Sequence, residues 1–140
     1  MPCRCSRAQI LCLMATGWTL SYDAADPHAL AAFWAQALGY VPEPGYDEPD
    51  GASIIDPDGS LPVIDFSRVP EGKTAKNRVH IDLEVAGKPP WDMVAREPLL
   101  RAKADELVAA GATRVREELN GENLSHIVML DPEGNEFCVA

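Results

Sequence analysis

Close to its end the chain reads Asp131-Pro132-Glu133-Gly134-Asn135-Glu136-Phe137-Cys138-Val139, and the first four of these residues repeat the pattern of Asp56-Pro57-Asp58-Gly59. Each Asp-Pro-acid-Gly tetrapeptide is by itself a common turn, because Pro and Gly supply the backbone angles that turns need. The two copies, however, stand at the same place in the same order of predicted elements. An internal repeat of this kind indicates architecture more strongly than a single motif does. The chain is therefore predicted to contain one module twice.

The first half predicts a strand, a helix and further strands. Residues 18–23 alternate apolar and polar side chains, which is typical of a half-buried strand. Asp26 and Pro27 are typical of a helix start, because Asp caps free amides and Pro fits the first helical position. Gly39 is typical of a helix end. The half continues with a loop over residues 40–50 and with strands over residues 52–55 and 62–69.

The second half repeats this order, with a longer connection before its helix. Residues 78–85 alternate cleanly, which places the apolar residues on the core face and His80 and Asp82 on the opposite face. A loop over residues 87–96 leads to a helix predicted from Pro98 to Gly111. Further strands are predicted over residues 113–117, 125–130 and 135–139.

These elements predict an α+β fold in which two paired βαβββ modules form an open, cup-shaped mixed sheet. The modules are residues 14–70 and 77–140 of a single domain over residues 14–140. Residues 1–13 are expected to form an irregular tail outside it. Because each helix covers one face of its strands, the other two faces are expected to enclose a common chamber, with His80 pointing into it.

Composition limits what the protein binds. The 140 residues include 12 Lys and Arg against 22 Asp and Glu, and this net charge of −10 argues against nucleic acid or an anionic membrane as a partner. A chain of this length can hold a core without a structural metal or disulfide. Cys3, Cys5 and Cys12 crowd the N-terminus rather than framing loops, which favours a reducing, cytoplasmic location. Small molecules and proteins remain as partners, and a small-molecule ligand is expected.

Three segments carry a family resemblance. They are the helix over residues 26–39, the stretch 73–83 with Arg78-Val79-His80-Ile81-Asp82 at its centre, and the ending over residues 131–139. Together with the duplication, they resemble the vicinal oxygen chelate superfamily and, within it, the glyoxalase-like branch. The resemblance covers about residues 16–140. It implies paired modules around a cup, frequent homodimers and, in many members, a divalent metal ion that holds two substrate oxygens. The fold follows from this resemblance, whereas the reaction does not.

In metal-using members, the resemblance implies one ligand on the first strand and one on the last strand of each module. These positions fall near Thr19, Asp65, His80 and Cys138. Thr19 is a poor ligand because a neutral hydroxyl is a weak donor, and Cys138 replaces the usual carboxylate. The predicted metal ligands are therefore Asp65, His80 and Cys138. Since this ligand set is incomplete, the sequence favours neither a site with one divalent metal ion nor a metal-free site.

Other polar residues near these positions are candidates for chemistry and for ligand contacts. The predicted catalytic residues are His80, Asp82 and Glu136. The predicted ligand-binding residues are Thr19, Lys76 and Arg78. The two cations belong to the one local basic cluster of an acidic chain, so they are expected to attract a carboxylate or phosphate group.

Three of these residues also have explanations without chemistry. His80 is equally well explained as part of a polar strand face that hydrogen-bonds to Asp82 and binds no metal. Asp65 fits a charged residue that protects an edge strand from pairing. Cys138 stands between two apolar residues and fits a small buried side chain. The sequence leaves these alternatives open.

Two classes of function remain, with a third behind them. The first is a lyase or isomerase of a small anionic or carbonyl-containing molecule, in which a divalent ion or His80 polarises a carbonyl and a nearby carboxylate moves a proton. The second is a metal-free cup that sequesters a small molecule, as in bleomycin resistance. A ring-cleaving dioxygenase is third, because it needs two His and a carboxylate on iron and Thr19 stands at one His position. A homodimer is expected, since apolar residues exceed what one small cup covers.

Overall fold

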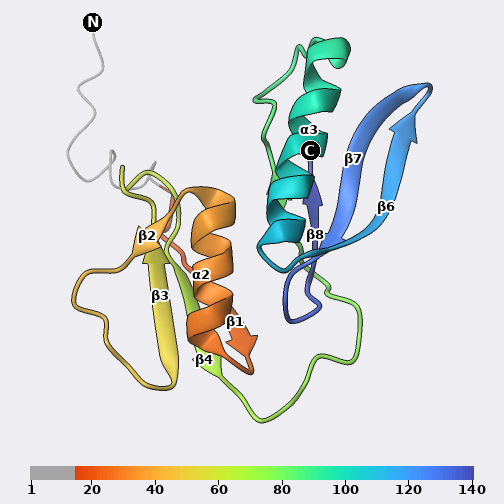
Figure 1. Cartoon of the computed structure of the whole chain (residues 1–140). Helices are drawn as coiled ribbons and strands as arrows, with labels where there is room; N and C mark the ends of the chain where they lie inside the picture. The colour runs from red at the N-terminus through yellow and green to blue at the C-terminus, as the bar shows by residue number, and fades with distance from the viewer. Residues whose placement is uncertain (1–14) are drawn as a thin grey trace, which may run out of the picture.

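The structure, a computed structural model, describes residues 15–140, and the tail expected over residues 1–13 lies outside the described residues. Two modules follow each other along the chain, and each contributes a four-stranded sheet and one helix (Figure 1). The first contains β1 (Leu20–Ala24), α2 (Pro27–Leu38), β2 (Val41–Pro42), β3 (Gly51–Ile55) and β4 (Ile64–Arg68). The second contains β5 (Asp82–Leu83), α3 (Met93–Ala109), β6 (Thr113–Asn120), β7 (Asn123–Leu130) and β8 (Glu136–Val139).

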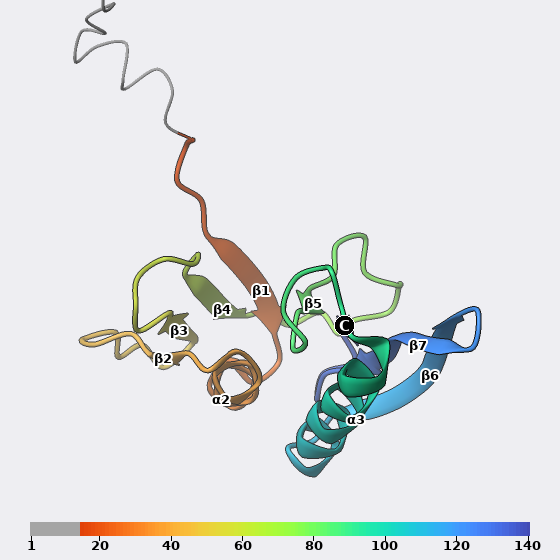
Figure 2. The same ribbon diagram turned by 90° about the horizontal axis from the view of Figure 1, so that it is seen from above.

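The strand order is equivalent in the two sheets, β1-β4-β3-β2 and β5-β8-β7-β6. The first and last strands of each module pair in parallel, with Ser21 beside Asp65 in one sheet and Asp82 beside Cys138 in the other. The remaining pairs are antiparallel. The predicted α+β class and the duplication are confirmed. Both sheets are mixed and open. Their edge strands β1 and β5 face each other across the middle of the molecule (Figure 2).

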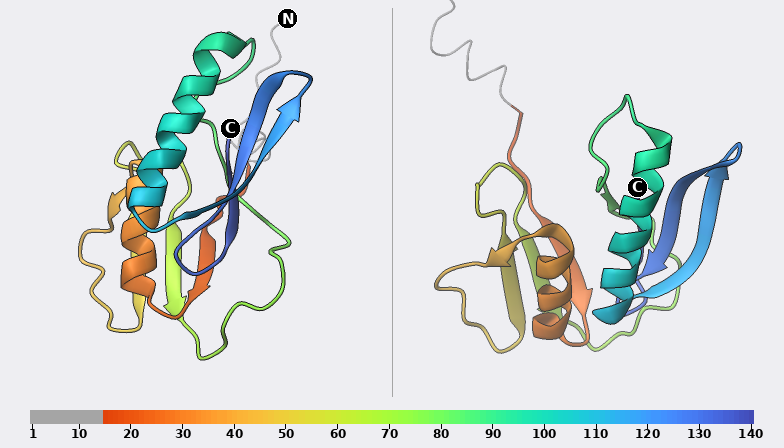
Figure 3. Two further views of the ribbon diagram at one scale, coloured as in Figure 1. Left: turned by 45° about the vertical axis from the view of Figure 1, so that its right-hand side comes forward. Right: turned by 45° about the horizontal axis from the view of Figure 1, so that its top comes forward.

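Each helix lies along the sheet of its own module (Figure 3). Helix α2 begins as predicted, because the side chain of Asp26 accepts a hydrogen bond from the amide of Ala29. It ends at Gly39, whose φ of 72° is a left-handed conformation that Gly adopts without steric cost. Its apolar face buries Phe33 and Trp34. None of the helices within residues 15–140 has the length and hydropathy needed to cross a bilayer.

Helix α2 also joins the two modules. The Trp34 indole donates a hydrogen bond from Nε1 to Oδ2 of Asp131, at 3.0 Å, in the turn that precedes β8. Its ring packs edge-on against Phe137 of β8, with ring centroids 5.1 Å apart. At the start of the helix, the backbone amides of Ala25 and Asp26 both donate to the Glu133 carboxylate. The repeated turn of the second module is therefore part of the contact between modules.

The strand predicted over residues 78–85 is much shorter in the structure. Only Asp82 and Leu83 form β5, and Val79, which the alternation placed in the core, is 72% exposed. The reason is the register with its partner β8. Because Asp82 lies beside Cys138, residues 78 and 79 lie beyond Glu136, the first residue of β8, and the first backbone hydrogen bond between the two segments runs from the Cys138 amide to the carbonyl of Ile81. Residues 78 and 79 therefore have no strand of this sheet to pair with.

Helix α3 begins earlier than predicted. It starts at Met93 rather than at Pro98, because the Asp92 side chain accepts hydrogen bonds from the amides of Val94 and Ala95. Pro98 lies inside the helix. The predicted loop over residues 87–96 thus contains the first turn of α3. Strands β6 and β7 are also longer than predicted and form a continuous hairpin through Gly121.

Candidate functional site

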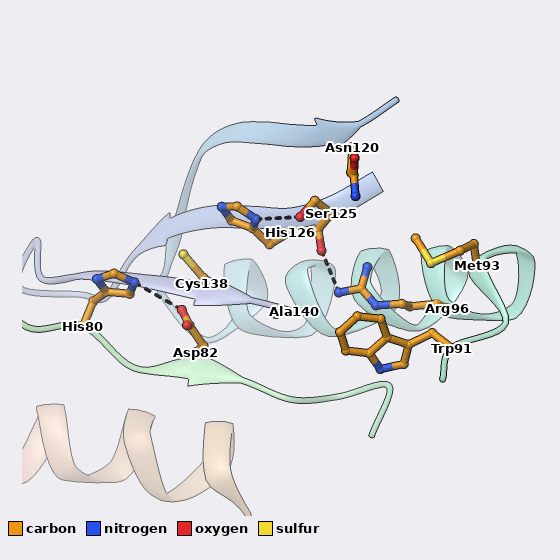
Figure 4. Close-up of a pocket in the computed structure, with 10 residues that line it drawn as sticks. All are labelled: His80, Asp82, Trp91, Met93, Arg96, Asn120, Ser125, His126, Cys138 and Ala140. Carbon is orange, nitrogen blue, oxygen red and sulfur yellow. Dashed lines mark hydrogen bonds and ion pairs between the residues drawn. The ribbon is translucent and has the colours of Figure 1, made fainter. Parts of the chain in front are cut away.

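A pocket of about 350 Å³ lies over the second sheet, within the range of small-molecule sites (Figure 4). Side chains from β5, β7, β8 and the beginning of α3 line it. One end is formed by His80, Asp82 and Cys138, which we call the His80 cluster. The other end is formed by Trp91, Met93 and Arg96, with His126 between the two ends on the sheet (Figure 4).

The His80 cluster brings three kinds of metal-binding atom together. One ligand atom from each residue lies within 4.8 Å of the other two. Asp82 and Cys138 are neighbours on the parallel strands β5 and β8, so their side chains share a face of the sheet. The Nε2 atom of His80 lies 3.3 Å from Oδ1 of Asp82, and both side chains are about half exposed. Cys138 lies deeper and is only 8% exposed.

The Cys138 thiol is held in its neutral form. Burial raises its pKa to about 11, and the negative charge of Asp82 adds to the effect. At neutral pH the sulfur therefore keeps its proton. A metal ion bound by Cys138 would have to displace that proton, so its affinity would depend on pH.

The donor set fits a borderline-soft divalent ion. An imidazole nitrogen, a carboxylate oxygen and a thiolate sulfur are all ligands of Zn²⁺, and three protein donors with one open position are typical of catalytic zinc. Hard ions such as Mg²⁺ and Mn²⁺ prefer oxygen donors, of which Asp82 supplies the one carboxylate in the cluster. His80, Asp82 and Cys138 can therefore hold one ion.

The structure does not bring two of the predicted residues to this cluster. Asp65 lies on β4 beside Ser21, in the sheet of the first module, and Thr19 lies exposed just before β1. Neither lines the pocket. The expectation that both polar sheet faces enclose one chamber is therefore wrong for this pocket, which the second module lines alone. A second hollow of about 240 Å³ lies between β1 and residues 77–81, and His80 lines both.

Glu136 has a different environment from the one expected of a proton-transferring group. Its carboxylate accepts hydrogen bonds from the Asn77 amide at 2.9 Å and from Nζ of Lys73 at 3.1 Å. These contacts, the Asn77 amide foremost, lower the pKa of Glu136 to about 2. A carboxylate that stays ionised and paired anchors the loop before β5, and it is not among the residues that line the pocket.

The two predicted ligand-binding cations lie outside the pocket. Arg78 is exposed and lines the hollow beside β1, and Lys76 is exposed on the preceding loop. The charge of Lys76 nevertheless reaches Cys138, whose pKa it lowers slightly against the dominant effect of burial.

Two pocket residues are absent from the set of site residues predicted from the sequence. His126 extends from β7, with its Nδ1 3.1 Å from Oγ of Ser125. His126 and Val128 are two residues apart on a strand, so their side chains share a face, and Val128 lies beside Cys138 of β8. This spacing is the signal that could have placed His126 on the face of the sheet that carries Cys138. Arg96 continues the buried stripe of α3, a signal that was lost because the helix was predicted to start at Pro98.

Comparison with known families identifies the chain. Residues 19–140 match the model of a family described as a glyoxalase-like domain. The chain belongs to this glyoxalase-like family. A search of proteins with curated descriptions finds no match.

Solved structures of the glyoxalase/bleomycin resistance/dioxygenase class share the fold of this glyoxalase-like protein. One such enzyme from Burkholderia phytofirmans PsJN has a TM-score of 0.66 and 18% identity, over 86% of this chain and 94% of that chain. A variant of the fosfomycin resistance protein FosX from Listeria monocytogenes, solved with Mn(II) and a dihydroxypropylphosphonic acid, has a TM-score of 0.64 and 14% identity, over 90% of each chain. The oxidase ChaP-H2 has a TM-score of 0.58 and 17% identity, over 91% and 93%. At these identities the likeness shows the fold alone.

Proposed function

We propose that this glyoxalase-like protein is a metal-dependent lyase or isomerase of a small carbonyl or hydroxy compound, with a divalent ion held by the His80 cluster. The observation that supports it is the meeting of three ligand atoms within 4.8 Å at one end of a pocket large enough for a small substrate. When bound, the ion polarises a substrate oxygen and stabilises the negative charge that develops on it.

In this proposal, His126 moves the proton. It lines the same pocket from β7, and the contact between its Nδ1 and Oγ of Ser125 fixes the orientation of the ring. That contact leaves Nε2 to a substrate, and imidazole is the side chain most often used for proton transfer near neutral pH. Asp82 and Cys138 then act as ligands, and Glu136 holds the loop that carries His80.

Metal analysis with matched variants tests the proposal. Because Cys3, Cys5 and Cys12 also offer thiols, the protein is studied with all three replaced by Ser. The protein is purified without added ions, loaded with Zn²⁺ and then dialysed against metal-free buffer. It is expected to retain about one ion per chain.

The variants identify the ligands. His80→Ala and Cys138→Ser, made in the same Cys-to-Ser protein, are expected to lose the ion, because two donors do not hold Zn²⁺ against dialysis. His28→Ala is the control, since His28 lies on α2 outside the pocket and contacts the carbonyl of Glu48. Loss of the ion in the control, or its retention without His80, would contradict the proposed centre.

One observation favours a second function, a metal-free protein that binds and sequesters its ligand. The Nε2 atom of His80 lies 3.3 Å from Oδ1 of Asp82, so these two side chains pair with each other without an ion. If the Cys-to-Ser protein retains no Zn²⁺ at neutral pH, the metal-free binder replaces the lyase as the best account of the pocket.

A further inference from the structure

Helix α3 carries a charged residue on its buried face. The buried residues of this helix are Arg96, Leu100, Ala104 and Leu107, and Arg96 alone among them is polar. Only 5% of Arg96 is exposed. A guanidinium keeps its charge at any physiological pH, and a charge in such a position costs free energy unless an opposite charge compensates it.

The contacts of Arg96 satisfy some of its hydrogen bonds but not its charge. Nη1 donates to the carbonyl of Leu124 at 2.8 Å, and Nη2 donates to the carbonyl of Ser125 at 2.6 Å. The Trp91 ring lies 4.8 Å from Cζ, a cation–π distance. Within residues 15–140, no hydrogen-bond partner faces Nε, which is a buried donor.

The other arginines show how unusual this is. Arg101, on the same helix, forms ion pairs with Glu97 and Glu117. Arg68, Arg114 and Arg116 each pair with a carboxylate as well. Arg78 has no such pair in the described part of the chain, but it is exposed to water. The chain has a net charge of −10, yet Arg96 is the one arginine of residues 15–140 that neither pairs with a carboxylate nor is exposed to water.

We propose that Arg96 binds the anionic group of the ligand, a carboxylate or a tetrahedral oxyanion such as phosphate or phosphonate. The anion accepts a hydrogen bond from Nε, which has no acceptor without it, and neutralises the guanidinium. The two carbonyl contacts hold the guanidinium in place before the ligand arrives, which lowers the entropic cost of binding. Trp91, which is half exposed at this end of the pocket, covers the bound group.

This site defines the class of ligand more closely. Arg96 and the His80 cluster lie at opposite ends of one pocket (Figure 4). The ligand is therefore a small acid with a carbonyl or hydroxyl oxygen at the end remote from its anionic group. Only the assignment of that remote end rests on the proposed function, because the charge of Arg96 calls for an anion with or without a metal ion.

The first test observes Arg96 directly in the metal-free wild-type protein. Proton–nitrogen NMR follows the Nε–H resonances of the arginines during separate titrations with inorganic phosphate and with acetate. The Arg96 resonance is expected to shift and saturate with at least one anion, and the better anion distinguishes a tetrahedral from a planar group. The Arg101 resonance is expected to stay, because its Nε already donates to Glu97 at 2.9 Å. An Arg96 resonance that neither anion moves would overturn the proposal.

The second test compares two neutralised arginines by calorimetric titration with the better anion. Arg96→Gln is expected to weaken binding at least about tenfold, whereas Arg101→Gln leaves it unchanged. Arg96→Lys, which keeps the charge but loses the planar fork, is expected to bind more tightly than Arg96→Gln. Equal weakening in the Arg96→Gln and Arg101→Gln proteins would indicate general screening and would overturn the proposal. If Arg96→Gln does not fold, the NMR titration and Arg96→Lys decide.

The metal-free titrations separate this inference from the proposed function. An anion that binds at Arg96 in a protein that retains no Zn²⁺ supports the anion site and contradicts the metal-dependent lyase. A protein that retains Zn²⁺ while neither anion reaches Arg96 contradicts the anion site and leaves the metal centre standing.

Discussion

The two modules of this protein share their strand order, yet only the second carries the pocket lined by the His80 cluster. The main difference is the connection between the first strand and the helix, which spans residues 25–26 in the first module and residues 84–92 in the second. The longer connection carries Trp91 and leads directly into Met93 and Arg96 at one end of the pocket. The duplication thus supplies the scaffold, and one lengthened loop supplies a site.

The same positions of the two sheets also carry different chemistry. Asp82 and Cys138 correspond in register to Ser21 and Asp65, and His80 precedes Asp82 by two residues as Thr19 precedes Ser21. The second module therefore offers an imidazole, a carboxylate and a thiol. The first offers two hydroxyls and one carboxylate, which are weaker ligands for a borderline-soft ion.

The repeated turns differ in their surroundings in the same way. Asp56 accepts hydrogen bonds from the backbone amides of its own turn, including that of Asp58, and these lower its pKa. Asp131 likewise accepts hydrogen bonds from the amides of Glu133 and Asn135 in its own turn, but it is only 3% exposed and also accepts the indole hydrogen bond of Trp34. One sequence pattern thus serves as a surface turn in one module and as a contact between modules in the other.

The largest loss of stability is expected when the Asp of the second turn is replaced. Asp131→Ala leaves the Trp34 indole and the amides of Glu133 and Asn135 without their acceptor, and the free energy of unfolding should fall by about 3 kcal/mol. Asp56→Ala should cost clearly less, because water replaces its carboxylate. Urea denaturation of the two variants measures both losses, and equal losses would mean that Asp131 does not join the modules.

A second comparison concerns the two helix caps. Asp26→Ala and Asp92→Ala each remove a side chain that accepts amide hydrogen bonds at a helix start, so each should lower stability by about 1 kcal/mol. Only Asp92→Ala should also weaken phosphate or acetate binding, because Asp92 fixes the turn that carries Arg96. Thermal unfolding and anion titration of both variants check this. Weakened anion binding in Asp26→Ala would place the site elsewhere.

An effect of similar size, present only above a certain pH, is expected from Glu136. Its pKa in the folded protein is about 2, below the usual value of 4.5, so it contributes stability above pH 4.5 that is lost as the pH falls toward 2. Glu136→Gln should therefore lower the free energy of unfolding by about 1 kcal/mol at neutral pH. The difference from wild type should shrink below pH 4.5. A difference that stays constant across this range would show that the carboxylate charge is not the cause.

Much of the architecture was predictable from local pattern. The duplication and helix α2 with its cap at Asp26 follow from residue types at fixed spacings. The shortness of β5 did not follow, because it depends on the register in which β5 pairs with β8, and no local alternation contains that information. The expected homodimer stays a prediction.

The site was predictable only in part for a similar reason. His80, Asp82 and Cys138 stood out by residue type, and the structure brings them together. Arg96 did not, because Pro98 resembles a helix start and so hid the turn that Asp92 caps. The exclusion of Asp65 from the cluster depends on which sheet its strand joins, which is a property of the whole fold.

The claim that the second module holds a metal through Cys138 is tested most directly by cobalt absorption spectroscopy. The protein in which Cys3, Cys5 and Cys12 are Ser is titrated with Co²⁺ at neutral pH. The account predicts a sulfur-to-cobalt charge-transfer band in the near ultraviolet that saturates at about one ion per chain and is absent from Cys138→Ser made in the same protein. No such band at saturating Co²⁺, or an unchanged band without Cys138, would contradict it.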